Sequence, residues 1–227
     1  MKPDFYVRAP GRVNFLGSHI DCSKFPVLAT ALEHDIIVCC ALSGDDTITI
    51  NNTNEEEFTP QTISTDPAQP FKAKGHFNNY FLCGYKAILS EDSPVALDES
   101  TPPKGMNILV DSLVPHCAGL GSSGTFTVAT AITTMHANGL TAKLDKDTLS
   151  ALTISAERMS GVAAGGMDQT VSIMGKKDTI SLIEFEPAVK AIDIPFPESV
   201  SIVVANSLTP CPKIQTVGTQ YNKRVTE

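Results

Sequence analysis

The chain has 227 residues, of which 42% are hydrophobic and 19% are charged, and its formal net charge is −8. This length suits one large domain or two small ones with a proper core. The acidic balance and the scattered Lys and Arg argue against a nucleic-acid-binding protein, which needs a basic face. No apolar run approaches the ~18 residues of a membrane helix. We therefore expect a globular protein without nucleic-acid or membrane partners.

The cysteines and the first residues bear on the cellular compartment. The chain has six cysteines and no C-x-x-C pair, and Cys39 and Cys40 lie together in an apolar, strand-like stretch. The opening residues, MKPDFYVRAPGR, lack the apolar segment of a signal peptide. This pattern favours buried, reduced thiols in a cytoplasmic protein.

Strands and polar connections are expected in the first third of the chain. Residues 4–10 have the composition of a strand, with a Pro-Gly dipeptide to end it. The β-branched apolar run over 36–42 predicts a buried strand. Residues 45–52 alternate as an exposed edge strand does, and the proline-containing residues 54–76 read as a polar connection.

Helices and strands mix without regular βαβ alternation in the rest of the chain, which favours an α+β fold. Helical spacing of apolar residues predicts helices over 78–89, 125–139, 147–161 (with Asp147 as N-cap) and 167–174. Apolar, β-branched stretches predict a strand followed by a turn within 105–115, and strands over 179–185 and 199–207.

The stretch GLGSSG, from Gly119 to Gly124, lies between a predicted strand and a predicted helix. Free N–H groups and partial positive charge make a helix N-terminus a natural phosphate seat. A dinucleotide fold would need an acidic residue after the next strand, whereas Asp145 and Asp147 precede a helix. A Walker A loop would need a lysine, where this chain has Thr125. A turn that only caps the helix is the third interpretation.

Three longer segments narrow these interpretations. They are APGRVNFLGSHID at 9–21, PHCAGLGSSG at 115–124 and AERMSGVAAGGMDQTVSIMG at 156–175. In this order they resemble the three N-terminal signatures of the galactokinase branch of the GHMP small-molecule kinases, and N-acetylgalactosamine kinases more closely still. Flanking segments such as GMNILVD and VVANS extend the resemblance over essentially the whole chain. It implies that residues 1–227 form a GHMP-kinase N-terminal domain, a ribosomal-protein-like two-layer fold of strands and helices.

The resemblance implies an ATP-dependent sugar 1-kinase that phosphorylates the anomeric hydroxyl of galactose or N-acetylgalactosamine. The Ser123 hydroxyl and the Glu157 carboxylate would hold Mg²⁺, a hard cation that takes oxygen ligands. Backbone N–H groups of one loop would wrap the phosphates of ATP. That ATP-binding loop comprises Gly119, Leu120, Gly121, Ser122, Ser123, Gly124 and Thr125.

Two residues would carry the chemistry. Asp168 would accept the proton of the anomeric hydroxyl. Arg12 would favour the carboxylate form of Asp168 and would offset the negative charge on the phosphoryl group that is transferred. The implied sugar contacts are Ser18, His19, Asp21, Gly165, Asp168 and Tyr221. From the residues alone, Ser123 could equally be a helix-start hydroxyl, Glu157 part of a solvated helix face, Asp168 a partner of the helix dipole, and Arg12 a surface residue.

The chain departs from the family pattern in several places. Ser18 stands where a Glu usually contacts the hydroxymethyl end of the sugar, and Cys22 replaces a usual Tyr. The small residues Ala164 and Gly166 would admit a C2 acetamido group, which weakly favours N-acetylgalactosamine. Family members are about twice as long, so the C-terminal domain is expected to be largely missing from these residues. We expect residues 1–227 alone to turn over poorly, because water exclusion and substrate positioning need both walls of the cleft.

Two other functions remain open. A catalytically inactive galactokinase-like sensor of sugar and ATP, acting through protein contacts, would keep most of the binding residues. Homoserine and mevalonate kinases of the wider superfamily share GLGSSG, but the segments SHID and GGMDQ favour the galactokinase branch. The expected partners are a small-molecule sugar and ATP, and the sequence leaves the oligomeric state open, a monomer included.

Overall fold

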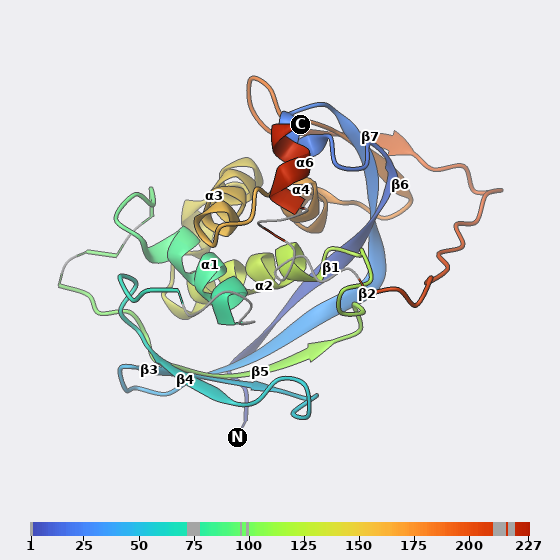
Figure 1. Cartoon of the computed structure of the whole chain (residues 1–227). Helices are drawn as coiled ribbons and strands as arrows, with labels where there is room; N and C mark the ends of the chain where they lie inside the picture. Colours follow the sequence, from blue (N-terminus) through green and yellow to red (C-terminus); the bar gives the residue numbers. More distant parts are fainter. Residues whose placement is uncertain (1, 72–77, 96, 99, 211–216, 218–220) are drawn as a thin grey trace.

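The structure, a computed structural model, describes residues 2–71, 78–95, 97–98, 100–210, 217 and 221–227. In this part of the chain one seven-stranded sheet carries helices on one of its faces (Figure 1). The strands are β1 Phe5–Leu16, β2 Val27–Leu42, β3 Thr47–Asn52, β4 Gln61–Ser64, β5 Met106–Ser112, β6 Thr179–Glu184 and β7 Lys190–Pro195. The helices are α1 Asn78–Leu89, α2 Ser122–Ala137, α3 Lys146–Met159, α4 Met167–Met174 and α6 Asn222–Thr226, with short 3₁₀ turns η1 Asp21–Ser23 and η2 Thr141–Lys143.

The sheet is organised around the long strand β2. The strand order is β4-β3-β5-β2-β6-β7, and β1 pairs with β2 off this path. β3 and β5 are parallel, and the other pairs are antiparallel. The two ends of β2 have different partners, with β5 beside residues 36–42 and β6 beside residues 27–29. β2 therefore joins the two halves of the sheet.

β1 does not end at the Pro-Gly dipeptide, so this prediction is wrong. The strand continues to Leu16, and its register against β2 shifts between Pro10 and Arg12. A bulge tolerates proline because one residue drops out of the hydrogen-bond ladder. After the bulge, the Arg12 amide donates to the carbonyl of Leu120 at 3.1 Å. The irregularity thus brings β1 into contact with the glycine-rich loop.

Other strand predictions failed because strand pairing is not local. Residues 45–52 were expected at an edge, but β3 lies between β4 and β5, with Ile48 and Ile50 fully buried. β4 occupies part of the expected polar connection, and β7 was not predicted. Residues 199–207 form no strand, and Val203 there is 90% exposed. β propensity produces a strand only where a neighbouring strand is available.

The helix predictions agree better with the structure. α1 and α4 match residues 78–89 and 167–174, and α2 begins three residues before its predicted start. α3 begins earlier than predicted, because Asp145 rather than Asp147 caps it by accepting the Thr148 amide at 2.7 Å. Over the described residues, no helix combines the length and apolar character needed to cross a membrane. The helices instead bury their apolar faces against the sheet in one large core cluster.

The cysteine prediction holds only in part. The Cys40 and Cys83 thiols are buried, whereas the Cys22, Cys39 and Cys117 side chains are partly exposed. Burial, assisted by the nearby charge of Asp4, raises the pKa of Cys40 to about 12. Cys211 lies outside the described residues.

Candidate active site

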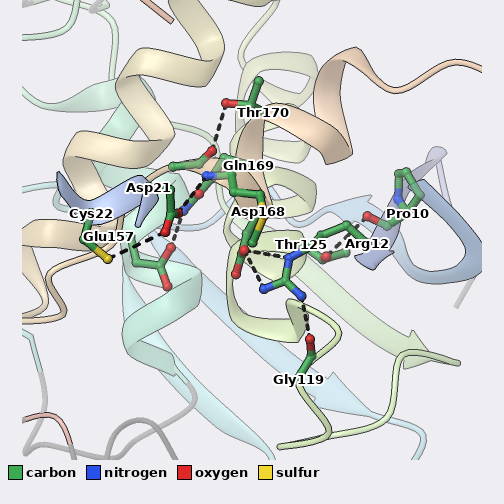
Figure 2. A network of polar contacts seen from close by, with 12 residues as sticks. Pro10, Arg12, Asp21, Cys22, Gly119, Thr125, Glu157, Asp168, Gln169 and Thr170 are labelled. Carbon is green, nitrogen blue, oxygen red and sulfur yellow. Dashed lines mark hydrogen bonds and ion pairs between the residues drawn. The ribbon is translucent and has the colours of Figure 1, made fainter. Parts of the chain in front are cut away.

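Arg12 connects two features that lie far apart in the sequence: the acid at the start of α4 and the glycine-rich loop. Its Nε and Nη2 atoms lie 2.7 and 2.6 Å from Oδ1 of Asp168, and Nη1 donates to the carbonyl of Gly119 at 2.5 Å (Figure 2). The Arg12 and Asp168 side chains are only 6% and 12% exposed. Arg12 is therefore not a surface residue, and its guanidinium holds a carboxylate 156 positions away in the chain.

Backbone conformation or close packing explains why glycine stands at three positions of the loop. Gly119 and Gly121 have φ values of 77° and 78°, a left-handed conformation that glycine adopts without strain. A Cβ atom at Gly124 would lie 2.6 Å from Cβ of Asp168, so only glycine lets α2 approach α4 this closely. Thr125 is fully buried and donates its hydroxyl to the carbonyl of Pro10 at 3.3 Å. Helix α2 therefore begins beside Asp168.

A second contact brings Asp21 to the N-terminus of α4. The Met167 amide donates to Asp21 Oδ2 at 3.3 Å, and the Cys22 thiol donates to Oδ1 at 3.7 Å. Asp21 is buried. A Cβ atom at Gly165 would lie 2.2 Å from Cγ of Asp21, so this glycine is required by close packing. The structure therefore gathers Asp21, Gly165 and the first turn of α4 in one place.

Glu157 is buried rather than on a solvated helix face, so that alternative is wrong. It is 2% exposed and accepts a hydrogen bond at Oε2 from Nε2 of Gln169. Sequence reasoning assigned no role to Gln169, and only its place beside Asp168 could have drawn attention to it. α3 and α4 are thus linked through a buried amide–carboxylate pair.

The segment near residue 221 also reaches the site. The ring centroids of His19 and Tyr221 lie 4.7 Å apart at an interplanar angle of 62°. Burial, and next the negative charge of Asp168, raise the pKa of Tyr221 above its usual value, with smaller contributions from Cys22, Asp21 and Glu157. The Tyr221 phenol therefore stays neutral among acidic neighbours. Ser18 and His19 are both exposed to solvent.

A hollow lies beside Cys22. Its volume of about 370 Å³ is within the size range of small-molecule sites. Cys22, Arg158, Ala164 and Asn222 are among its lining residues. Arg158 donates from Nε to the carbonyl of Ala164 at 2.8 Å and from Nη2 to that of Gly165 at 3.3 Å. These bonds hold the turn before α4 in place.

The predicted magnesium ligands fit the chemistry of that ion. Ser123 lies half-buried in the first turn of α2, one residue before the glycine that contacts Asp168. Within the described ranges, no cluster of three or more His, Cys, Asp or Glu side chains could hold a metal ion. Mg²⁺ typically takes only one or two protein ligands and completes its shell with water and phosphate oxygens. A hydroxyl and a carboxylate suit this mode of binding.

Comparisons with known proteins show the family of the chain. A family model described as the GHMP kinases N terminal domain matches residues 79–176, and one described as the galactokinase galactose-binding signature matches residues 1–42. A Dictyostelium discoideum galactokinase is 38% identical over 231 residues, covering 100% of this chain and 44% of its own length. A Candida maltosa galactokinase is 36% identical over 182 residues, covering 79% of this chain and 82% of that protein.

The fold has a solved counterpart in Lactococcus lactis galactokinase complexed with galactose. The TM-score is 0.76 at 18% sequence identity, and the match covers 97% of this chain and 54% of that chain. The expected α+β fold of a GHMP-kinase N-terminal domain is confirmed. The chain spans less than half the length of the Dictyostelium relative. With two family models and relatives at this level of identity, the chain belongs to the galactokinase family of the GHMP kinases.

Proposed function

We propose that the protein is an ATP-dependent sugar kinase that transfers the γ-phosphoryl group of ATP to the anomeric hydroxyl of galactose. One observation carries the proposal: Arg12 binds both Asp168 and the Gly119 carbonyl, so the candidate base lies beside the candidate phosphate loop. Galactokinase relatives of 33–38% identity support the same reaction. N-acetylgalactosamine is a second candidate sugar, because Ala164 and Gly166 are small and the hollow extends beside Ala164.

The residues divide the work of phosphoryl transfer in this proposal. The backbone N–H groups at the start of α2 bind the phosphates, aided by the helix dipole. Asp168 orients the sugar hydroxyl and accepts its proton, while Arg12 offsets the charge that develops on the transferring group. Ser123 and Glu157 would hold Mg²⁺, which neutralises charge on the phosphate oxygens when bound. Asp21, Gly165 and Tyr221, together with the exposed Ser18 and His19, are the proposed sugar contacts.

We also propose how far the domain extends and in which cellular compartment the protein lies. Residues 1–227 would form one GHMP-kinase N-terminal domain with the galactokinase signature at 9–21, and a further C-terminal domain would complete the cleft. We also propose a cytoplasmic location, which suits the cysteine thiols of the described residues.

The test is product formation by the full-length protein. Purified protein is incubated with ATP, Mg²⁺ and one acceptor at a time: galactose, N-acetylgalactosamine, glucose, homoserine or mevalonate. We expect ADP and galactose 1-phosphate. If the protein binds galactose and ATP tightly but forms no sugar phosphate, its function is that of a sensor and not of a kinase. Phosphorylation of homoserine or mevalonate alone would overturn the sugar assignment.

The sugar-contact role of Asp21 predicts a large effect of Gly165→Ala. The added Cβ would lie 2.2 Å from Asp21 Oδ2 and 2.5 Å from the Cys22 amide, so Asp21 must leave its position. We expect the Kd for galactose, measured by calorimetry, to rise at least about tenfold, a cost of about 1.4 kcal/mol. The Kd for ATP should stay within twofold of the parent value.

Gly139→Ala is the control for this prediction. Gly139 lies just beyond the C-terminal end of α2, and a Cβ atom there meets no atom within 4 Å. Its positive φ of 70° adds strain without touching Asp21. Equal losses of galactose affinity in both variants would remove Asp21 and Gly165 from the sugar site.

A further inference from the structure

We propose that Gln169 is a positioning residue that orients the Glu157 carboxylate toward nucleotide-bound Mg²⁺. The proposal rests on the proposed function, in which Glu157 is one of two protein ligands of that ion. It adds a residue to which neither the sequence motifs nor the comparisons assign a role.

Two consecutive side chains of α4 serve different parts of the site. Neighbouring residues of an α-helix project about 100° apart. Asp168 points to Arg12 and the glycine-rich loop, while Gln169 points to α3 and donates to Glu157 (Figure 2). Gln169 is fully buried, so its amide is held by packing as well as by hydrogen bonding. A shift of α4 would therefore also move the Glu157 carboxylate, because Gln169 is hydrogen-bonded to it.

A neutral amide is the donor best suited to this task. Lys or Arg beside Glu157 would neutralise the carboxylate and compete with a cation for its oxygens. The Gln169 amide instead fixes one oxygen, Oε2, and leaves the negative charge in place. Hydrogen bonds of this kind to ligating carboxylates typically account for about 10–100-fold in metal affinity.

The other end of the amide supports the same role. Oε1 of Gln169 is buried and has no hydrogen-bond partner in the described residues. A buried acceptor without a donor is costly, and the water molecules that Mg²⁺ retains are donors. A Cβ atom at Gly124 would lie 3.5 Å from Cδ of Gln169, so the amide lies close to the first turn of α2, which also carries Ser123. Gln169 thus lies between the elements that carry both proposed ligands.

The test separates metal binding from nucleotide binding in the full-length protein. The Kd for ATP is measured by calorimetry with EDTA and then across a Mg²⁺ titration, for the parent and for Gln169→Leu. We expect the Kd in EDTA to stay within about twofold. The Mg²⁺ concentration for half-maximal tightening should rise about 10–100-fold, because Glu157 loses the donor that orients it.

Thr170→Val is the matched control for damage to the helix. Thr170 is also fully buried in α4, and its hydroxyl donates to the Gly166 carbonyl at 2.8 Å. The variant loses one buried hydrogen bond but none that reaches Glu157, so we expect an unchanged Mg²⁺ dependence. An equal shift in Gln169→Leu and Thr170→Val would mean a merely structural role and would overturn the proposal.

Glu157→Gln distinguishes failure of this inference from failure of the proposed function. If the Mg²⁺ dependence collapses in Glu157→Gln but is normal in Gln169→Leu, Glu157 remains a ligand and Gln169 does not position it. If Glu157→Gln binds MgATP as the parent does, the ligand role of Glu157 is wrong and the inference falls with it.

Discussion

Replacing Asp168 by Asn lowers the rate of sugar 1-phosphate formation by about 10²–10⁴-fold, the usual contribution of a positioned general base. Asn keeps the shape of the side chain and an oxygen that accepts from Arg12, but it cannot take up the proton of the sugar hydroxyl. The measurement is the initial rate of the full-length protein at saturating galactose and MgATP. The Kd for galactose is measured alongside, and we expect it to change far less than the rate.

Asp193→Asn is the control for this prediction, because it removes a carboxylate that pairs with Lys176 at the surface. Its rate should equal that of the parent protein. Should Asp168→Asn retain more than about a tenth of the parent rate, Asp168 orients the substrate without acting as its base.

Replacing Arg12 by Met lowers the free energy of unfolding by about 3–5 kcal/mol, because breaking a buried ion pair leaves a buried charge without its partner. Asp168 and the Gly119 carbonyl both lose the bonds that Arg12 makes, while the long apolar Met side chain keeps much of the packing volume. Urea unfolding with a common slope measures the loss. We also expect galactose phosphorylation to disappear, since the loop and α4 lose their connection.

Lys176→Met is the matched control, because it breaks an ion pair of similar length at the surface. The Lys176 and Asp193 side chains are 66% and 29% exposed and 2.6 Å apart. Exposed pairs contribute only about 0–1 kcal/mol. Comparable losses in the two variants would show that the Arg12–Asp168 pair does not stabilise the site more than a surface pair does.

The local part of the fold was predictable from sequence. α1 and α4 occupy residues 78–89 and 167–174 as expected, because helical periodicity is a property of a short window of sequence. The glycine-rich loop was placed correctly between a strand and a helix for the same reason. The order of the three motifs along the chain also indicates the family.

Strand positions were less predictable because pairing joins distant residues. Alternation in β3 indicated one buried face but not that β4 would cover its edge. β1 continues past Pro10 because a bulge against β2 absorbs the irregularity. The apolar stretch at 199–207 has strong strand propensity, yet it pairs with nothing in the described part of the chain.

The sequence by itself determined the family, the helices and the residue types that phosphoryl transfer requires. Only the tertiary structure decided which of those residues meet: Arg12 with Asp168, and Gln169 with Glu157. The physical reason is that helix periodicity acts over a few residues, whereas these side chains come from different elements. Their contacts depend on a bulge in β1 and on the glycine that lets α2 pack against α4.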